Sequence, residues 1–409
     1  MNFFSRRLAL SLSLCNIASA GINFLAILFY SWFFGLADIG LLAIVTSVSS
    51  LFLPLITFRL DLAFHRLPEE DRQGLAALIV VWGAGVATVV AVIGLGAYLL
   101  LGWQSLLVVT AIPLHLMFSS ANSAIWAQKV CDRRLSDVAV LQIVRSLLAA
   151  GLPFALATQI EGASALIYGQ IFAQLTFLLF LPARKHFRLD RLQTRLIWTR
   201  TEARDLVVDN TLPLLVNSAS LHLNPVLAAT IFGPEAAAVL WMIFRLFLTP
   251  ASLIADPVRR DFYANFTDGR IINRDVRRSL LLHKGVVLGL GILVFSGLWI
   301  ASQFLDFSAQ LNMLGNYPLI AALGVVWAGA ILFNAPSSGL IPVLRMARIQ
   351  TVFEAFGFIV RIGSLLLGLL GLPLETCLVL FLASTIGINL ALGALIDWNI
   401  WRKSNTSHG

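Results

Sequence analysis

Long apolar runs, each about the length of a membrane-spanning helix, recur along the 409-residue chain and are separated by short polar stretches. A transmembrane helix needs about 20 mostly apolar residues, and twelve such runs can be placed, six on either side of a basic stretch. The spans predicted in the first half are 8–31, 39–58, 75–101, 104–126, 139–159 and 162–182. The spans predicted in the second half are 206–231, 235–257, 280–302, 317–335, 351–371 and 375–397.

The basic stretch at 183–205 divides the chain into two halves of similar length. Lys and Arg residues beside membrane spans are retained on the cytoplasmic side, so we interpret this stretch as a cytoplasmic linker. It joins an N-terminal lobe, 1–182, to a C-terminal lobe, 206–397, and a cytoplasmic tail follows at 398–409. The spacing of its leucines would suit a helix lying on the membrane surface, and a solvated basic loop is an equally open interpretation.

The composition agrees with this pattern. Hydrophobic residues make up 58% of the chain and charged residues only 12%, whereas soluble domains carry about 25% charged residues. We therefore predict an all-α polytopic membrane protein.

The net charge of +8 lies mostly in short loops, where it sets topology, and this placement argues against binding to nucleic acid. The three scattered cysteines show neither a disulfide pattern nor the spacing of a metal site.

The distribution of basic residues also predicts the orientation. With the N-terminus inside, inward loops receive all but three of the 29 Lys and Arg residues, and outward loops such as 303–316 receive none. This allocation includes Lys284, which it assigns to the cytoplasmic loop before the ninth span. Both termini are therefore expected in the cytoplasm.

Short motifs recur in the two halves about 200 residues apart. The matched positions are Phe34-Gly35 with Phe232-Gly233, Pro54 with Pro250, and Arg59-Leu60-Asp61 with Arg259-Arg260-Asp261. Because each half has six spans, both halves enter the membrane from the same side. This predicts a parallel repeat about a pseudo-two-fold axis along the membrane normal, an architecture found among alternating-access carriers.

The three basic residues outside the loops, Arg145, Arg245 and Arg361, lie within predicted spans. A charge near the centre of a span costs about 3 kcal/mol on insertion scales and usually faces a cavity or a partner. The acidic residues in or beside the C-terminal spans are expected near cytoplasmic helix ends: Asp209, Asp256, Glu354 and Asp397. Two interpretations stay open for these arginines: a buried ion pair, and a cavity for an anionic substrate. For Arg145 a third is open, in which its long side chain extends to the cytoplasmic membrane surface.

Uncharged polar residues occupy the middle of two spans. The candidates for lining a hydrophilic path are Asn122, Asn217 and Asn224, and the candidates for ion coupling are His115, His222 and Asp209. Hydrogen bonding between helices is the alternative for each of them. Asn217 and Asn224 are seven residues apart and share a helix face, and Pro225 is a candidate break in that helix.

Catalytic motifs are missing from the sequence. It contains no glycine-rich nucleotide loop, no nucleophile elbow and no metal-ligand spacing. The outward loops are too short to build the active site of a membrane-bound polymerase or ligase. We therefore expect a protein that is not an enzyme and that uses no cofactor or metal.

Residues 57–64 (TFRLDLAF), followed by Leu67-Pro68 and an acidic stretch, are similar to an element of the Wzx-type polysaccharide flippases, although Leu60 replaces an aromatic residue and Asp61 the usual Glu. Residues 231–236 (IFGPEA) leading to 244–246 (FRL), and 145–147 (RSL), are also similar to this family. The chain thus resembles Wzx flippases of the multidrug/oligosaccharidyl-lipid/polysaccharide exporter (MOP) superfamily.

The resemblance implies a MATE-like, V-shaped bundle of two six-helix lobes in the bacterial inner membrane. It implies that the protein flips undecaprenyl-diphosphate-linked oligosaccharide, such as an O-antigen unit, to the periplasmic leaflet, beside other polysaccharide-assembly membrane proteins. Arg245 would be the main substrate contact, assisted by Arg361 and Arg145. Three alternatives stay open: a lipid II-type flippase, a MATE-type drug or cation antiporter, and a membrane enzyme of envelope polysaccharide assembly.

Overall fold

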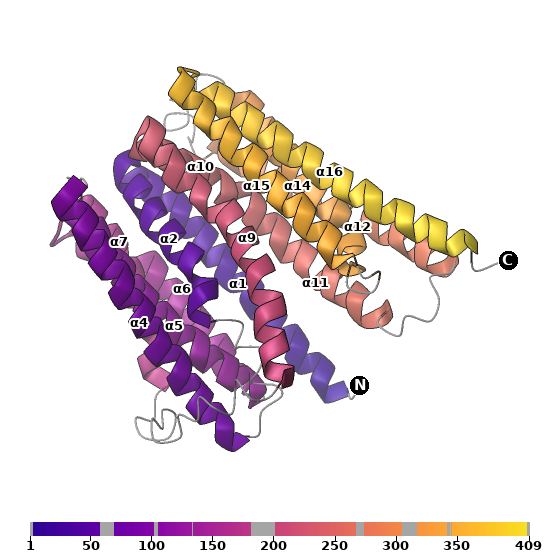
Figure 1. Cartoon of the computed structure of the whole chain (residues 1–409), viewed down its shortest axis with the longest axis horizontal. Helices are drawn as coiled ribbons and strands as arrows, with labels where there is room; N and C mark the ends of the chain where they lie inside the picture. Colours follow the sequence, from indigo (N-terminus) through magenta and orange to yellow (C-terminus); the bar gives the residue numbers. More distant parts are fainter. Residues whose placement is uncertain are drawn as a thin grey trace. The chain divides into compact units, whose positions relative to one another are not determined.

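The computed structural model describes residues 3–57, 69–101, 105–132, 134–180, 201–266, 274–304, 317–341, 344 and 346–406. These residues are almost entirely helical (Figure 1). The helices up to residue 232 are α1 (Phe3–Phe33), α2 (Leu36–Thr57), α4 (Glu69–Leu101), α5 (Leu106–Cys131), α6 (Leu135–Ala157), α7 (Gly162–Ala173), the 3-10 helix η1 (Gln174–Phe180) and α9 (Thr201–Phe232). The later helices are α10 (Pro234–Ile243), the π-helix η3 (Phe244–Leu248), α11 (Thr249–Phe266), α12 (Arg274–Phe304), α14 (Tyr317–Gly339), α15 (Ala347–Leu366), the 3-10 helix η5 (Leu367–Leu370) and α16 (Leu374–Thr406).

The predicted fold class is confirmed, because every predicted span coincides with one helix or with a continuous series of helices. Among the described residues, eight helices are long and apolar enough to cross a membrane. Several helices outrun the predicted spans: α4 begins at Glu69, α11 ends at Phe266 and α16 continues to Thr406. The hydropathy pattern marks only the part of a helix that crosses hydrocarbon, whereas polar helix-forming residues extend the helix beyond it.

Several helices expose large apolar side chains. Large side chains stand exposed along two helices: Val89, Val92, Ile93 and Leu99 of α4, and Leu281, Leu282, Ile292 and Leu293 of α12. Extended apolar surfaces of this kind mark a contact with lipid or protein, and helices of this length suit a bilayer.

The first compact unit comprises Met1–Ala229. Within it α6 packs against α1 and α7, and α5 packs against α4 and α2. The contact between α4 and α5 depends on a missing side chain, because a Cβ atom on Gly83 would lie 2.4 Å from Ser120 Oγ. Small residues of this kind let membrane helices approach closely.

Proline also shapes the first unit. Pro153 lies inside α6 and has no N–H, so the carbonyl of Ala149 loses its helical donor. Two side chains replace that donor: the Tyr30 hydroxyl donates to Ala149 O, and Gln170 Nε2 donates to the same oxygen at 3.1 Å. The carbonyl of Ala149 therefore joins α1, α6 and α7 through hydrogen bonds. These bonds also meet the requirement that a backbone carbonyl inside a membrane has a donor within the protein.

The second compact unit comprises Thr230–Gly409. Its central helix, α14, packs against α11, α12 and α16, and α15 packs on α16; Figure 1 shows α14, α15 and α16 side by side. A core of Phe262, Leu280, Leu340 and Ile396 fills the space between α11, α12, α14 and α16.

The predicted linker lies mostly outside the described residues, which resume at Thr201 with the start of α9. The lobe boundary at 183–205 therefore stays a prediction. The two compact units divide within α9, after Ala229.

Candidate functional site

Arg145 lies inside the apolar helix α6, ten residues or about 15 Å from its first residue at the helical rise. Its side chain is partly buried. Within the described part of the chain, no carboxylate contacts the guanidinium. His115 of α5 lies near enough for the charge of Arg145 to act on its imidazole. The structure thus brings two of the predicted residues together.

Polar side chains line the α1–α6 contact beside Arg145. Asn23 Nδ2 donates to Ser146 Oγ at 3.1 Å. In the described residues, Ser19 Oγ and Gln142 Oε1 are buried and have no hydrogen-bond partner. The sequence reasoning missed this polar seam, although Ser19 and Asn23 share a helix face at a spacing of four residues.

Asn122 of α5 is buried and bonds within the protein. Its Nδ2 donates to the backbone oxygen of Gln174 at 2.5 Å and to the Gln174 side-chain oxygen at 2.9 Å. These bonds fix the position at which α7 changes into the 3-10 helix η1. The structure therefore uses the Asn122 amide nitrogen to join helices, which was the alternative interpretation.

Helix α9 carries four of the predicted residues and passes Pro225 without a break. The expected opening of this helix at Pro225 is therefore wrong. Asn224 is fully buried and its Nδ2 donates to Ser220 O at 2.6 Å, while His222 is partly buried. The side chains of Asn217 and Asp209 lie outside the described part of the structure.

The middle of α9 is fastened to α2 by one side-chain hydrogen bond. Pro54 lies inside α2 and leaves the carbonyl of Ser50 without its helical donor. Ser218 Oγ of α9 donates to Ser50 O at 2.8 Å. The proline that the repeat comparison identified thus creates an acceptor for another helix.

Arg245 lies in the π-helix η3, between α10 and α11. Its guanidinium carbon stands 5.2 Å from the ring centre of Trp241, a cation–π contact. The π-turn has a local cause: Pro250 cannot donate to the carbonyl four residues earlier, and Thr249 N–H instead bonds to Phe244 O. Such π-bulges are frequent at functional sites.

Arg361 of α15 is buried, 6% exposed, and its Nε donates to Thr385 Oγ1 of α16 at 3.3 Å. A hydrogen-bonded series continues from there. Asn389 Nδ2 donates to Thr385 O at 2.8 Å, and Asn334 Nδ2 of α14 donates to Asn389 O at 2.6 Å. The cation is therefore held in a polar seam across α14, α15 and α16.

An ion pair between a buried lysine and a partly exposed aspartate in the second unit escaped the sequence reasoning. Lys284 lies within α12, 4% exposed, and its Nζ bonds Asp397 Oδ2 of α16. Ser337 Oγ of α14 donates to the other carboxylate oxygen at 2.7 Å, and Lys284 Nζ lies 4.3 Å from the ring centre of Phe333. The prediction that Lys284 lies in a cytoplasmic loop is wrong, because the packed helix α12 starts ten residues earlier.

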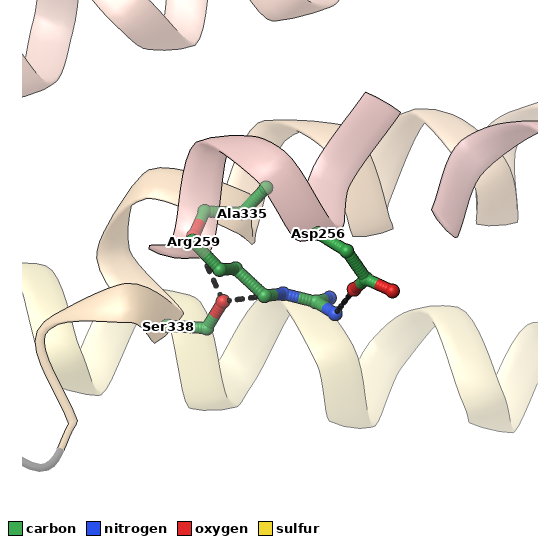
Figure 2. Close-up of polar contacts among 4 residues, drawn as sticks. All are labelled: Asp256, Arg259, Ala335 and Ser338. Atoms are coloured by element: carbon green, nitrogen blue, oxygen red, sulfur yellow. Dashed lines mark hydrogen bonds and ion pairs between the residues drawn. The ribbon is translucent and has the colours of Figure 1, made fainter. Parts of the chain in front are cut away.

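The repeat motif is only partly described. Arg59 and Asp61 lie outside the described residues, as does the side chain of Asp261. Arg259 of α11 donates through Nε to Ser338 Oγ and through Nη1 to Asp256 Oδ1, both at 2.9 Å, as Figure 2 shows. Asp256 lies inside α11 and three residues from the end of the candidate membrane span Pro234–Arg259, close to the span end where it was predicted.

Each unit thus contains at least one arginine inside an apolar helix. Arg145 lies near His115, Arg245 lies over the Trp241 ring, and Arg361 bonds to Thr385 and lies within electrostatic reach of Glu354. Such an arrangement can bind an anion, because guanidinium groups donate paired hydrogen bonds to phosphate or carboxylate oxygens.

Comparisons with known proteins bear on the fold. In sequence, neither a family model nor a curated protein matches. In structure, the chain is similar to an outward-facing multidrug resistance MATE family transporter of the MOP superfamily, with 14% identity, a TM-score of 0.60 and 96% of each chain covered. An inward-facing transporter of that description has 12% identity and a TM-score of 0.57, covering 97% of this chain and 95% of that chain.

A third similar structure is a MOP superfamily transporter from Pyrococcus furiosus, described by a reverse polarity of its binding pocket that suggests a different function. It has 12% identity and a TM-score of 0.54, covering 97% of this chain and 95% of that chain. At such identities the likeness shows the fold alone. The chain has the MATE-like, all-helical fold of multi-pass membrane proteins.

Proposed function

We propose that this protein is a flippase that moves undecaprenyl-diphosphate-linked oligosaccharide from the cytoplasmic to the periplasmic leaflet of the bacterial inner membrane. It would do so by alternating access, as the fold of its structural neighbours suggests for a transporter. The observation that carries the proposal is Arg145, a partly buried cation in an apolar helix with no carboxylate contact among the described residues.

A diphosphate is a suitable ligand for such a cation. Burying an arginine in a membrane bundle is costly, and a bound anion would offset that cost. We nominate Arg245 as the main contact, with Arg361 and Arg145 assisting, because guanidinium groups grip phosphate oxygens with two parallel hydrogen bonds. His115, which lies within electrostatic reach of Arg145, stays a candidate for ion coupling together with His222 and Asp209.

Export of cationic drugs is the second candidate function, and the likeness to multidrug transporters favours it. A cationic substrate would require an available carboxylate within the bundle. Asp397, which is 35% exposed, is already engaged by Lys284 and Ser337, and Glu354 lies within electrostatic reach of Arg361. These pairings disfavour this candidate. The Pyrococcus furiosus transporter, described by its reversed pocket polarity, supports the idea that one fold serves substrates of different charge.

Deletion of the gene is the test. The flippase should be required for a surface polysaccharide, and its loss should leave the lipid-linked unit in the inner leaflet. Complementation with Arg245→Lys should restore part of the polysaccharide, and Arg245→Ala should restore little at equal protein abundance. Normal polysaccharide together with altered sensitivity to cationic drugs would contradict the proposal and favour the antiporter.

A further inference from the structure

The turn between α6 and α7 forms a cavity of about 680 Å³ that is broadly open to the surface, and no arginine is among the residues that line it. Its volume lies within the range of about 300–1,000 Å³ that is typical of small-molecule sites. The residues that line it are Ala157, Gln159, Ile160, Glu161, Ser164 and Tyr168.

The polar groups around this cavity are largely unused by the protein itself. Glu161 occupies the N-cap position of α7, yet its side chain does not cap the helix. Within the described residues, the Glu161 carboxylate and the Ser164 and Tyr168 hydroxyls make no hydrogen bond or ion pair. The Gln159 amide makes one long contact, 3.5 Å to Thr158 Oγ1. Donors and acceptors around the cavity therefore remain available to a ligand.

The cavity also has an aromatic wall with a fixed orientation. Tyr168 is partly buried and stacks on Phe172, with ring centres 6.2 Å apart and planes at 24°. One face of its ring is thus supported by a second ring. An aromatic face next to amide, carboxylate and hydroxyl groups suits a sugar, whose C–H face is apolar and whose hydroxyls both donate and accept hydrogen bonds.

The turn is held firmly against α2. A Cβ atom on Gly162 would lie 2.4 Å from Asp38 Oδ2, so the two segments are in close contact. Asp38 in turn accepts a hydrogen bond from Gly35 N at 3.3 Å. A site built on fixed helix ends holds its side chains more precisely than a site on a long loop.

We propose that the cavity between α6 and α7 is a saccharide-binding subsite for the glycan of the transported lipid. This inference rests on the proposed function, and it adds a sugar-recognising site on the side of the membrane that the loop at 159–162 is predicted to face. Its one charged side chain is a carboxylate, which repels acidic sugars. The subsite is therefore selective for neutral or amino sugars over uronic acids.

Saturation-transfer NMR on the purified full-length protein in lipid nanodiscs tests this directly. The probes are three free disaccharides: diacetylchitobiose, which is neutral, chitobiose, which is cationic, and digalacturonate, which is acidic. The neutral and cationic sugars should receive saturation from the protein and the acidic sugar should not. Tyr168→Ala should weaken binding about fivefold or more, whereas Tyr168→Phe, which keeps the ring, should retain most of it.

Matched variants separate the subsite from general effects. Thr110→Ala changes an exposed threonine of α5 that does not line the cavity and should bind normally. Glu161→Gln should remove the discrimination against digalacturonate. Thermal unfolding of each variant shows whether it is folded. If Tyr168→Ala does not fold, the binding measured for Tyr168→Phe decides whether the subsite uses the aromatic ring. Absence of signal from all three sugars, or equal binding by Tyr168→Ala, would overturn the subsite.

The two proposals fail in different ways. If gene deletion leaves the lipid-linked unit in the inner leaflet but no disaccharide binds, the flippase stands and the subsite is wrong. If disaccharides bind and depend on Tyr168 while the deletion strain makes normal polysaccharide, the sugar site stands and the flippase assignment is wrong.

Discussion

Lys284 in the second unit and Arg145 in the first are both cations inside apolar helices, but their surroundings differ. Lys284 is bonded to Asp397, whose other oxygen accepts from Ser337, and it lies over the ring of Phe333. Arg145 has no carboxylate in contact with it among the described residues. A cation that is already neutralised fastens three helices together, whereas a cation without an acidic neighbour keeps its capacity to bind an anion.

Lys284→Met should produce the largest effect, because it leaves the Asp397 carboxylate inside the bundle without its cation. We expect the free energy of unfolding to fall by about 3 kcal/mol, at the low end for buried pairs because Asp397 retains some exposure. Thermal unfolding in detergent and the amount of protein in the membrane are the measurements.

Two further variants of this pair sharpen the result. Lys284→Met combined with Asp397→Leu should recover most of the lost stability, because an apolar pair of similar volume replaces the ion pair. Arg278→Met changes an exposed cation on the same helix and should change stability little. If Lys284→Met alone is as stable as the unmodified protein, Lys284 does not have the structural role that distinguishes it here from Arg145.

Arg145→Ala should leave stability near normal and reduce transport about thirtyfold, the effect of losing hydrogen bonds worth about 2 kcal/mol to a charged ligand. Arg145→Lys should keep part of the activity as a point charge. Flipping of lipid-linked oligosaccharide in proteoliposomes measures this, with Arg134→Ala, an exposed cation before the same helix, as control. Normal flipping with reduced protein abundance would assign Arg145 a structural role.

Gly393→Ala tests the hydrogen-bonded series from Asn334 and Asn389 to Thr385, the partner of Arg361. A Cβ atom on Gly393 of α16 would lie 2.0 Å from Asn334 Oδ1, so Asn334 has to move and its bond to Asn389 O weakens. We expect a loss of about 1.5 kcal/mol in unfolding free energy. Gly387→Ala on the same helix meets no atom within 4 Å, and equal loss in both variants would contradict the proposed crowding.

Asp256→Asn should have the smallest effect. The ion pair between Asp256 and Arg259 in Figure 2 joins side chains that are 52% and 37% exposed. Exposed pairs contribute about 0–1 kcal/mol, so thermal unfolding should change by about 0.5 kcal/mol or less, and less still at high salt. A loss of unfolding free energy as large as that expected for Lys284→Met would show that side-chain exposure does not determine how much each ion pair contributes to stability.

The sequence predicted the spans well because an apolar run of about 20 residues is a direct physical requirement of a bilayer. Helix ends such as Glu69 and Thr406 were missed, because hydropathy does not record where a helix continues into water. The π-turn at Arg245 was also missed. Pro250 indicates a disturbed helix, but the type of disturbance depends on packing.

The candidate site was less predictable because its contacts join residues far apart in the chain. The bond between Lys284 and Asp397 spans 113 residues, and no spacing rule connects them. A local signal did exist: the apolar residues 280–282 precede Lys284, so α12 was already within an apolar segment there. The inward positions of Arg145 and Arg361 were predictable from the cost of a charge in a span.

The π-turn at Arg245 has a geometric consequence. A π-turn contains one more residue than a turn of α-helix. Because an α-helix turns by about 100° per residue, this extra residue rotates the side chains of α10 by about 100° relative to those of α11, compared with an uninterrupted helix. Pro250 fixes where this rotation occurs, so Arg245 lies at the point where the helix changes the face that it presents.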